Sequence, residues 1–118
     1  MACSGCVDMD QHHWQDRVIL LFAADNEDEH YKAMRQQLDD EVDGVKDRDL
    51  VIYELFFDQS DGTAEATAEA WNVESAGFTY LLIGKDGRVK ARSEKAVAVE
   101  SIFRQIDSMP MRQREMRR

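Results

Sequence analysis

Residues 17–24 read RVILLFAA, an uninterrupted apolar run that follows a single arginine. Strands that are buried on both faces show such runs, whereas strands with one wet face alternate apolar and polar residues. The run therefore predicts a central, parallel strand of a sheet that is covered on both faces.

A helix is predicted directly after this strand. Asp25 and Asn26 are residue types that favour the N-cap, and the acids at 27–29 suit the positive end of a helix dipole. Gly44 is expected to close the helix as its C′ residue. Apolar residues recur in between at helical spacing: Tyr31, Met34, Leu38 and Val42.

The rest of the chain continues the alternation of strands and helices. A helix separates the first strand from the second, so these two strands should be parallel and joined by a right-handed crossover. Asp86-Gly87 predicts a hairpin between the last two strands, and Pro110 is expected to stop the closing helix. The predicted strands are 50–57, 78–83 and 88–93, and the predicted helices are 63–71 and 97–109.

The order β-α-β-α-β-β-α predicts an α/β, thioredoxin-like fold, with a mixed four-stranded sheet flanked by helices. A chain of 118 residues has room for one such core. We expect a flexible N-terminal arm at 1–13, the thioredoxin-like domain at 14–110 and a basic C-terminal tail at 111–118. Trp14 and Trp71 are expected in the core or at its edge.

Charge and hydropathy exclude several classes of function. The net charge of −9 disfavours nonspecific binding to nucleic acid or to an anionic membrane, and no apolar run is long enough to span a bilayer. No signal peptide pattern is visible, so we expect a cytoplasmic protein, or a periplasmic or secreted one if a signal peptide was removed upstream. The acidic surplus indicates a partner-binding face or adaptation to high salt.

Three segments resemble a bacterial family of domains of unknown function: residues 14–24 (WQDRVILLFAA), 77–87 (GFTYLLIGKDG) and 106–118 (IDSMPMRQREMRR). This family is identified as the prokaryotic branch of the DUDES group, whose vertebrate relatives include equarin and the sushi-repeat-containing extracellular proteins. The resemblance spans residues 14–118, and MPMRQREM at 109–116 is its most specific element. It implies a thioredoxin- or peroxiredoxin-like fold, often in exported proteins, with no established enzymatic activity.

The thioredoxin-type active site is predicted to be absent. Thioredoxins and peroxiredoxins carry their reactive cysteine after the first strand, where the start of a helix stabilises a thiolate. Residues 23–29 here read AADNEDE, which contain no cysteine and whose acids disfavour a thiolate. The position of the thioredoxin cis-proline, before the third strand, is occupied by Gly77-Phe78.

Cys3 and Cys6 form a C-x-x-C pair, a pattern typical of redox sites when it adjoins a βαβ unit. They lie well before the first strand, so they are either an exposed dithiol that exchanges disulfides or part of an idle leader. A thiol-disulfide oxidoreductase or peroxidase-like protein that uses this pair is therefore the alternative function.

No metal or other cofactor is predicted. Cys3, Cys6, His12 and His13 have zinc-binding side chains, but structural zinc sites separate their ligand pairs by a longer folded segment. Residues 39–44 (DDEVDG) are similar to the start of a calcium loop, yet Leu50 stands where the bidentate glutamate belongs. The histidines, His30 included, are expected at the surface, and the ten acids between 25 and 49 should form a solvated face.

The basic tail is the best candidate for partner binding. Its arginines could pack back onto the acidic body or clamp the carboxylates of a partner, with methionines adding an adaptable apolar contact. A frayed tail is the other interpretation. The arginines are Arg112, Arg114, Arg117 and Arg118, and the methionines are Met109, Met111 and Met116. The sequence thus favours a non-catalytic thioredoxin-fold module that binds a protein partner.

Overall fold

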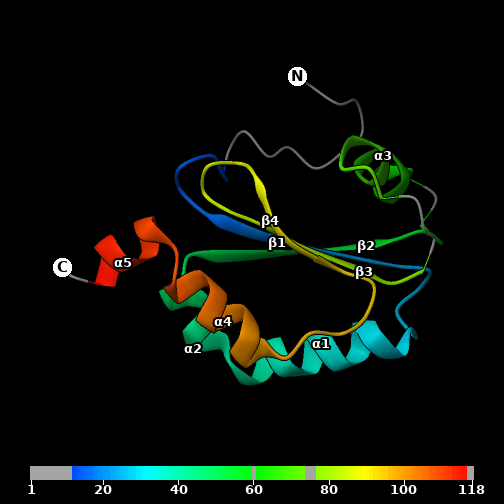
Figure 1. The fold of residues 1–118 in the computed structure, drawn as a ribbon. Coiled ribbons are helices and arrows are strands. Elements are labelled where there is room, and N and C mark those ends of the chain that lie inside the picture. The colour runs from blue at the N-terminus through cyan, green and yellow to red at the C-terminus, as the bar shows by residue number, and fades with distance from the viewer. Residues whose placement is uncertain (1–11, 60, 74–76, 117–118) are drawn as a thin grey trace.

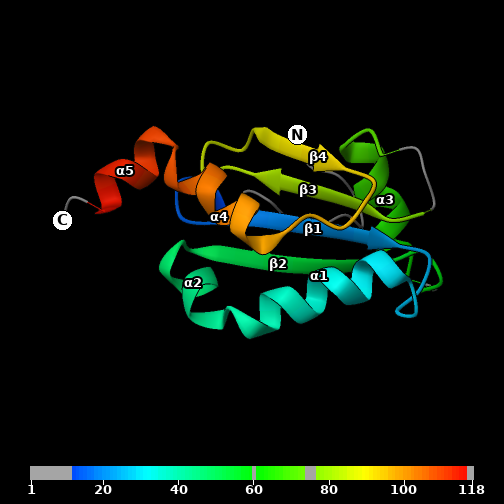
Figure 2. The same cartoon turned by 60° about the horizontal axis from the view of Figure 1, so that its bottom comes forward.

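The computed structural model describes residues 12–59, 61–73 and 77–116, and its sheet has the strand order β2-β1-β3-β4 (Figures 1 and 2). Strand β1 runs parallel to β2 and antiparallel to β3, and β4 pairs antiparallel with β3. The mixed four-stranded sheet and the thioredoxin-like α/β fold are thereby confirmed. The strands are β1 (Arg17–Ala23), β2 (Leu50–Phe56), β3 (Thr79–Ile83) and β4 (Val89–Ser93).

Helices cover both faces of this sheet. Helices α1 (Glu29–Asp40), α2 (Val42–Asp47) and α4 (Val99–Asp107) lie on one face, and α3 (Thr63–Ala70) lies on the other (Figures 1 and 2). Every residue of β1 is buried, as the apolar run predicts. The second strand of the pair, β2, forms one edge of the sheet and is less buried.

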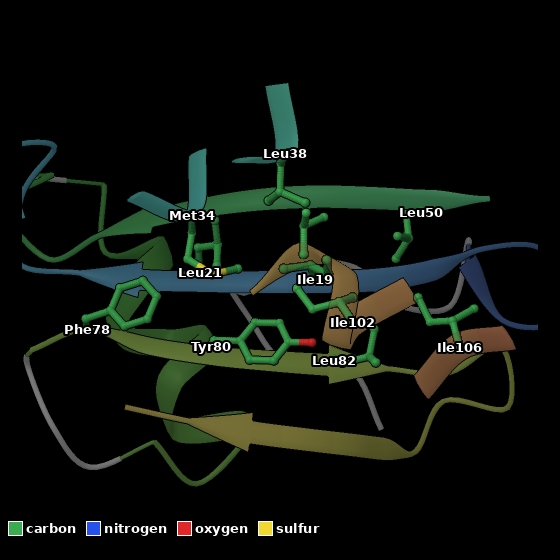
Figure 3. Packing of buried hydrophobic residues seen from close by; sticks show 11 residues of the cluster. Ile19, Leu21, Met34, Leu38, Leu50, Phe78, Tyr80, Leu82, Ile102 and Ile106 are labelled. Carbon is green, nitrogen blue, oxygen red and sulfur yellow. The ribbon is translucent and has the colours of Figure 1, made fainter. Parts of the chain in front are cut away.

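Alternate residues of β1 supply two separate cores. Ile19 and Leu21 face α1 and α4, where they meet Met34, Leu38, Ile102 and Ile106 (Figure 3). Val18, Leu20 and Phe22 pack instead with Ala64 and Ala68 of α3. Burial of large aliphatic side chains on both faces, at roughly 25 cal/mol per Å² of apolar surface, is the main stabilising contribution.

The register of β1 with β3 brings three distant segments to one end of the sheet. Val18 pairs with Ile83, so the residues before β1 lie beside the turn between β3 and β4. The backbone N–H of Trp14 donates to the carbonyl of Lys85 in that turn at 2.6 Å. The turn is the predicted hairpin, with Gly87 at φ +83°, where glycine carries no steric penalty.

The first helix differs from the prediction at both ends. Asp28, rather than Asp25 or Asn26, caps α1 by accepting the N–H of Tyr31 at 2.9 Å. Gly44 does not close the helix but lies inside α2. A Cβ atom at position 44 would come within 2.6 Å of the Phe103 ring, so glycine there allows α2 to pack closely on α4.

The end of the chain also differs. Helix α4 ends at Asp107, and Pro110 does not end a helix but begins α5 (Pro110–Met116). Proline suits the first position of a helix because its N–H would have no partner there. Residues 111–116, predicted as a tail, are therefore helical, and Arg112 on α5 is buried.

Candidate functional site

Helix α5 lies beyond the end of the sheet at which β1 begins (Figure 1). Its Glu115 faces two buried cations from other segments. The guanidinium of Arg17 donates to both carboxylate oxygens of Glu115, at 3.2 and 3.3 Å, and Lys85 Nζ lies 2.7 Å from Glu115 Oε2. The side chains of Arg17 and Lys85 are only 1% and 8% exposed, so Glu115 compensates charges that water barely reaches.

Arg112 fixes the other side of α5. Its guanidinium donates to the Asp47 carboxylate and to the Asp47 carbonyl, which lies 3.0 Å away. Its Nε also donates to Asp107 at 3.1 Å, and Asp107 accepts a two-point contact from Arg48. Arg48 in turn lies over the ring of Phe103, 4.0 Å from its centroid. The arginine therefore ties α5 to both α2 and α4.

We call these groups the α5 ion network. Hydrogen bonds from Lys85 and Arg17 outweigh the effect of burial and lower the pKa of Glu115. For Asp107, bonds from Arg48 and Arg112 likewise outweigh burial and lower the pKa. Both carboxyl groups are thus ionised at neutral pH. The network comprises four cations, Arg17, Arg48, Lys85 and Arg112, and four carboxylates, Asp47, Asp49, Asp107 and Glu115.

A cavity of about 380 Å³ opens beside this network, which we call the α5 cavity. Its size lies in the range of ligand-binding clefts. The segment from α4 to α5 and Trp14, which precedes β1, both contribute apolar residues to its lining. The apolar lining consists of Trp14, Met109, Pro110 and Met111, and the charged lining of Arg17, Lys85, Asp86, Lys90 and Arg114.

Trp14 is held at the cavity by an unusual backbone conformation. Its φ is +68°, in the left-handed region that large side chains rarely adopt. The carbonyl of His12 accepts both the Gln15 and the Asp16 N–H, which, with the bond to Lys85, fixes the turn. The Trp14 side chain is 58% exposed, so the expectation that it belongs to the core or its edge is wrong. Trp71, in contrast, is half-buried against the core beneath α3.

Arg114 is a cation of the α5 cavity that lies outside the α5 ion network. Within the described ranges it makes no ion pair, and its Nε only approaches the Pro110 carbonyl at 3.4 Å. Lys90 is paired with Asp86 at 2.9 Å, and Arg17 and Lys85 belong to the balanced α5 ion network. The exposed guanidinium of Arg114 is therefore available to an anion at the cavity mouth.

The opposite end of β1, where α1 begins, is occupied by acids in local hydrogen bonds. Asp25 accepts the N–H of Glu27 at 2.9 Å, and Asp28 caps α1. Glu27 pairs with Lys32 across the surface at 2.8 Å. Most acids between 25 and 49 are exposed, as predicted for a solvated face, and Asp47 and Asp49 are among them even though they pair with buried Arg112 and Lys85.

The three histidines have different surroundings. His12 is buried, not at the surface: its Nδ1 lies 2.8 Å from Asp16 and its Nε2 lies 2.6 Å from the Tyr53 hydroxyl. With both ring nitrogens engaged, His12 would have to break a hydrogen bond to bind zinc. His13 is exposed and stacks on Trp14. His30 is exposed, as predicted, and accepts the Ala96 N–H.

Several candidates fall outside the described residues, namely Cys3, Cys6, Arg117 and Arg118. No group of three or more metal-ligating side chains occurs in the described part of the chain. Sequence reasoning missed Arg17, Lys85 and Glu115. The pattern that could have revealed this site is an arginine at the start of an apolar strand. A guanidinium buried there requires a carboxylate from elsewhere in the chain.

A family profile described as domain of unknown function DUF4174 matches residues 8–115. No curated protein gives a significant match. Among the described residues, no helix has both the length and the apolar character required to cross a membrane.

Two solved structures resemble the fold. The reduced 2-Cys peroxiredoxin of Plasmodium vivax has a TM-score of 0.68 and 16% identity, and the match covers 92% of this chain and 85% of that one. The mitochondrial 2-Cys peroxiredoxin of Plasmodium falciparum has a TM-score of 0.63 and 15% identity, with 86% and 80% covered. At these identities the likeness shows a peroxiredoxin-like fold alone.

Proposed function

This chain belongs to the family of domain of unknown function DUF4174, and we propose that it is a non-catalytic binding module built on the peroxiredoxin-like fold. We also propose the finer placement of the family in the DUDES group. The MPMRQREM element that carries this placement supplies α5 and the single residue before it, Met109.

The observation that carries the proposal is the chemistry at the start of α1. A thiol-based enzyme of this fold needs a cysteine there, in a setting that favours the thiolate. Residues 23–29 supply Asp25, Glu27, Asp28 and Glu29 instead, and the first three take part in local hydrogen bonds. These negative charges would disfavour the negative charge of a thiolate at the start of α1. The position therefore suits helix capping rather than nucleophilic catalysis.

Binding is supported at the other end of β1. The α5 cavity combines a largely exposed tryptophan, methionines and an arginine without a carboxylate partner in the described chain. These residue types are enriched where proteins bind other proteins. A protein partner is therefore the class of ligand that we propose.

The test is a pair of activity assays, reduction of insulin disulfides by dithiothreitol and reduction of hydrogen peroxide. We expect the wild type to be no faster than a Cys3→Ser/Cys6→Ser double variant in either assay. Wild-type turnover that the double variant loses would establish the alternative, an oxidoreductase that uses Cys3 and Cys6. Turnover that the double variant retains would also overturn the proposal.

A further inference from the structure

The geometry points to a specific occupant for the α5 cavity: an acidic segment of a partner protein that places a large apolar side chain against Trp14 and a carboxylate on Arg114. This inference rests on the proposed function, and it adds where the partner binds and what its binding segment looks like.

The exposed indole is the first observation. More than half of the Trp14 surface is open to water, although this residue type is usually well buried. Its left-handed backbone is held by three hydrogen bonds, from its own N–H to Lys85 and from Gln15 and Asp16 to His12. Conformations of this kind cost energy and persist where the surroundings enforce them, which is common at binding sites.

The cavity lining provides further apolar surface besides Trp14. Met109, Pro110 and Met111 line the same cavity as Trp14. Methionine side chains are flexible and polarizable, so they adapt to apolar groups of different shapes and make favourable contacts with aromatic rings. An aromatic or long aliphatic side chain in this cavity would thus meet an indole and two thioethers among its lining groups.

Charge determines which segments bind. The eight groups of the α5 ion network balance one another, and Lys90 is neutralised by Asp86. Among the described residues, the charge at the cavity that has no ion-pair partner is therefore the guanidinium of Arg114. The whole chain carries −9, so this site differs in sign from the protein as a whole. A carboxylate can form a two-point contact with Arg114, whereas a cation would be repelled at the site.

The open shape favours a segment of a protein over a small molecule. Small-molecule clefts bury most of the surface of their ligand, whereas the wall formed by Trp14 is itself largely exposed. Tryptophan, methionine and arginine are enriched at protein interfaces, and tryptophan and arginine dominate their binding energy. The site is also preformed, because ion pairs of Glu115 and Arg112 anchor α5 to the rest of the domain.

The experiment uses the full chain with Trp71→Phe, which leaves Trp14 as its single tryptophan. The probes are three synthetic heptapeptides blocked at both ends, each with a central phenylalanine flanked by aspartates, asparagines or lysines. We expect the aspartate peptide to shift Trp14 emission and to bind about tenfold more tightly than the asparagine peptide, as loss of one charged hydrogen-bonding pair implies. The lysine peptide should not bind.

Three variants, measured by calorimetry, locate the contacts. Arg114→Gln should reduce affinity for the aspartate peptide to that of the asparagine peptide. Trp14→Ala should abolish binding of both. Arg104→Gln is the matched control, because Arg104 is an exposed arginine on α4 that does not line the cavity. It should leave both affinities unchanged, and circular dichroism should show that all variants are folded.

Several results would overturn the inference. These are equal binding of the aspartate and asparagine peptides, no binding of either, binding of dodecanoate in their place, or self-association in sedimentation that Trp14→Ala abolishes. None of them bears on the assays with insulin and peroxide. Failure of the docking site can therefore be distinguished from failure of the proposed function.

Discussion

The two ends of β1 both carry acidic side chains, yet these acids contribute very differently. At the α1 end, Glu27 and its partner Lys32 are 75% and 54% exposed, so water screens their attraction. At the α5 end, Glu115 is 19% exposed and faces Arg17, which is 1% exposed. A carboxylate at the surface is readily replaced by water, whereas one that faces a buried cation is not. The acids at the α1 end therefore suit solubility, whereas the acids at the α5 end hold their surroundings in a fixed geometry.

That difference matters for function. The acids at the α1 end make local contacts, so changes among them should disturb the fold less than changes at the α5 end. The end with the α5 ion network couples the start of β1, the β3–β4 turn, α2, α4 and α5. A binding surface built there is held in place by contacts among these segments, as a preorganised site requires.

The largest effect should come from Glu115→Gln. This change leaves Arg17 and Lys85 with one anionic partner fewer while keeping the size of the side chain. We expect the free energy of unfolding in urea to fall by about 3 kcal/mol, the usual cost of removing one partner from a buried charged pair. Arg17 retains its bond to the Arg48 carbonyl and Lys85 its pair with Asp49, so the loss should not be larger.

The matched control is Glu27→Gln, the same chemical change in the exposed pair at the α1 end. It should leave the urea midpoint unchanged. If the two variants were equally stable, the contrast between the ends of β1 would be wrong, and α5 would not depend on its ion network.

The next effect is the response to acid. Because the pKa values of Glu115 and Asp107 are lowered in the folded protein, their stabilisation is complete above the ordinary values of 4.5 and 3.8. It is lost as the pH falls through the lowered folded values. We therefore expect the free energy of unfolding to decrease progressively below about pH 4.5. Measured across the same range by urea titration, Glu115→Gln should decrease less steeply, and an equal slope would exclude a role for Glu115.

How far the sequence predicts this molecule depends on the range of the interactions involved. The apolar run 17–24 and the Asp-Gly turn are local patterns, and both yielded the correct strands and hairpin. The contact between Arg17 and Glu115 joins residues 98 positions apart, and no local pattern encodes it. Gly44 and Pro110 were misassigned for a related reason. Glycine serves helix ends and close packing alike, and proline both follows helices and begins them, so only the tertiary contacts decide.

The smallest effect, and the one that refines the contrast between the ends of β1, concerns the cap of α1. Asp28→Ala removes the acceptor for the Tyr31 N–H and should cost about 1 kcal/mol of unfolding free energy. Asp28→Asn keeps that acceptor while removing the charge, so it should restore most of the stability. If Asp28→Asn were as unstable as Asp28→Ala in the urea titration, charge rather than capping would explain this acid. The α1 end would then depend on electrostatics as the α5 end does.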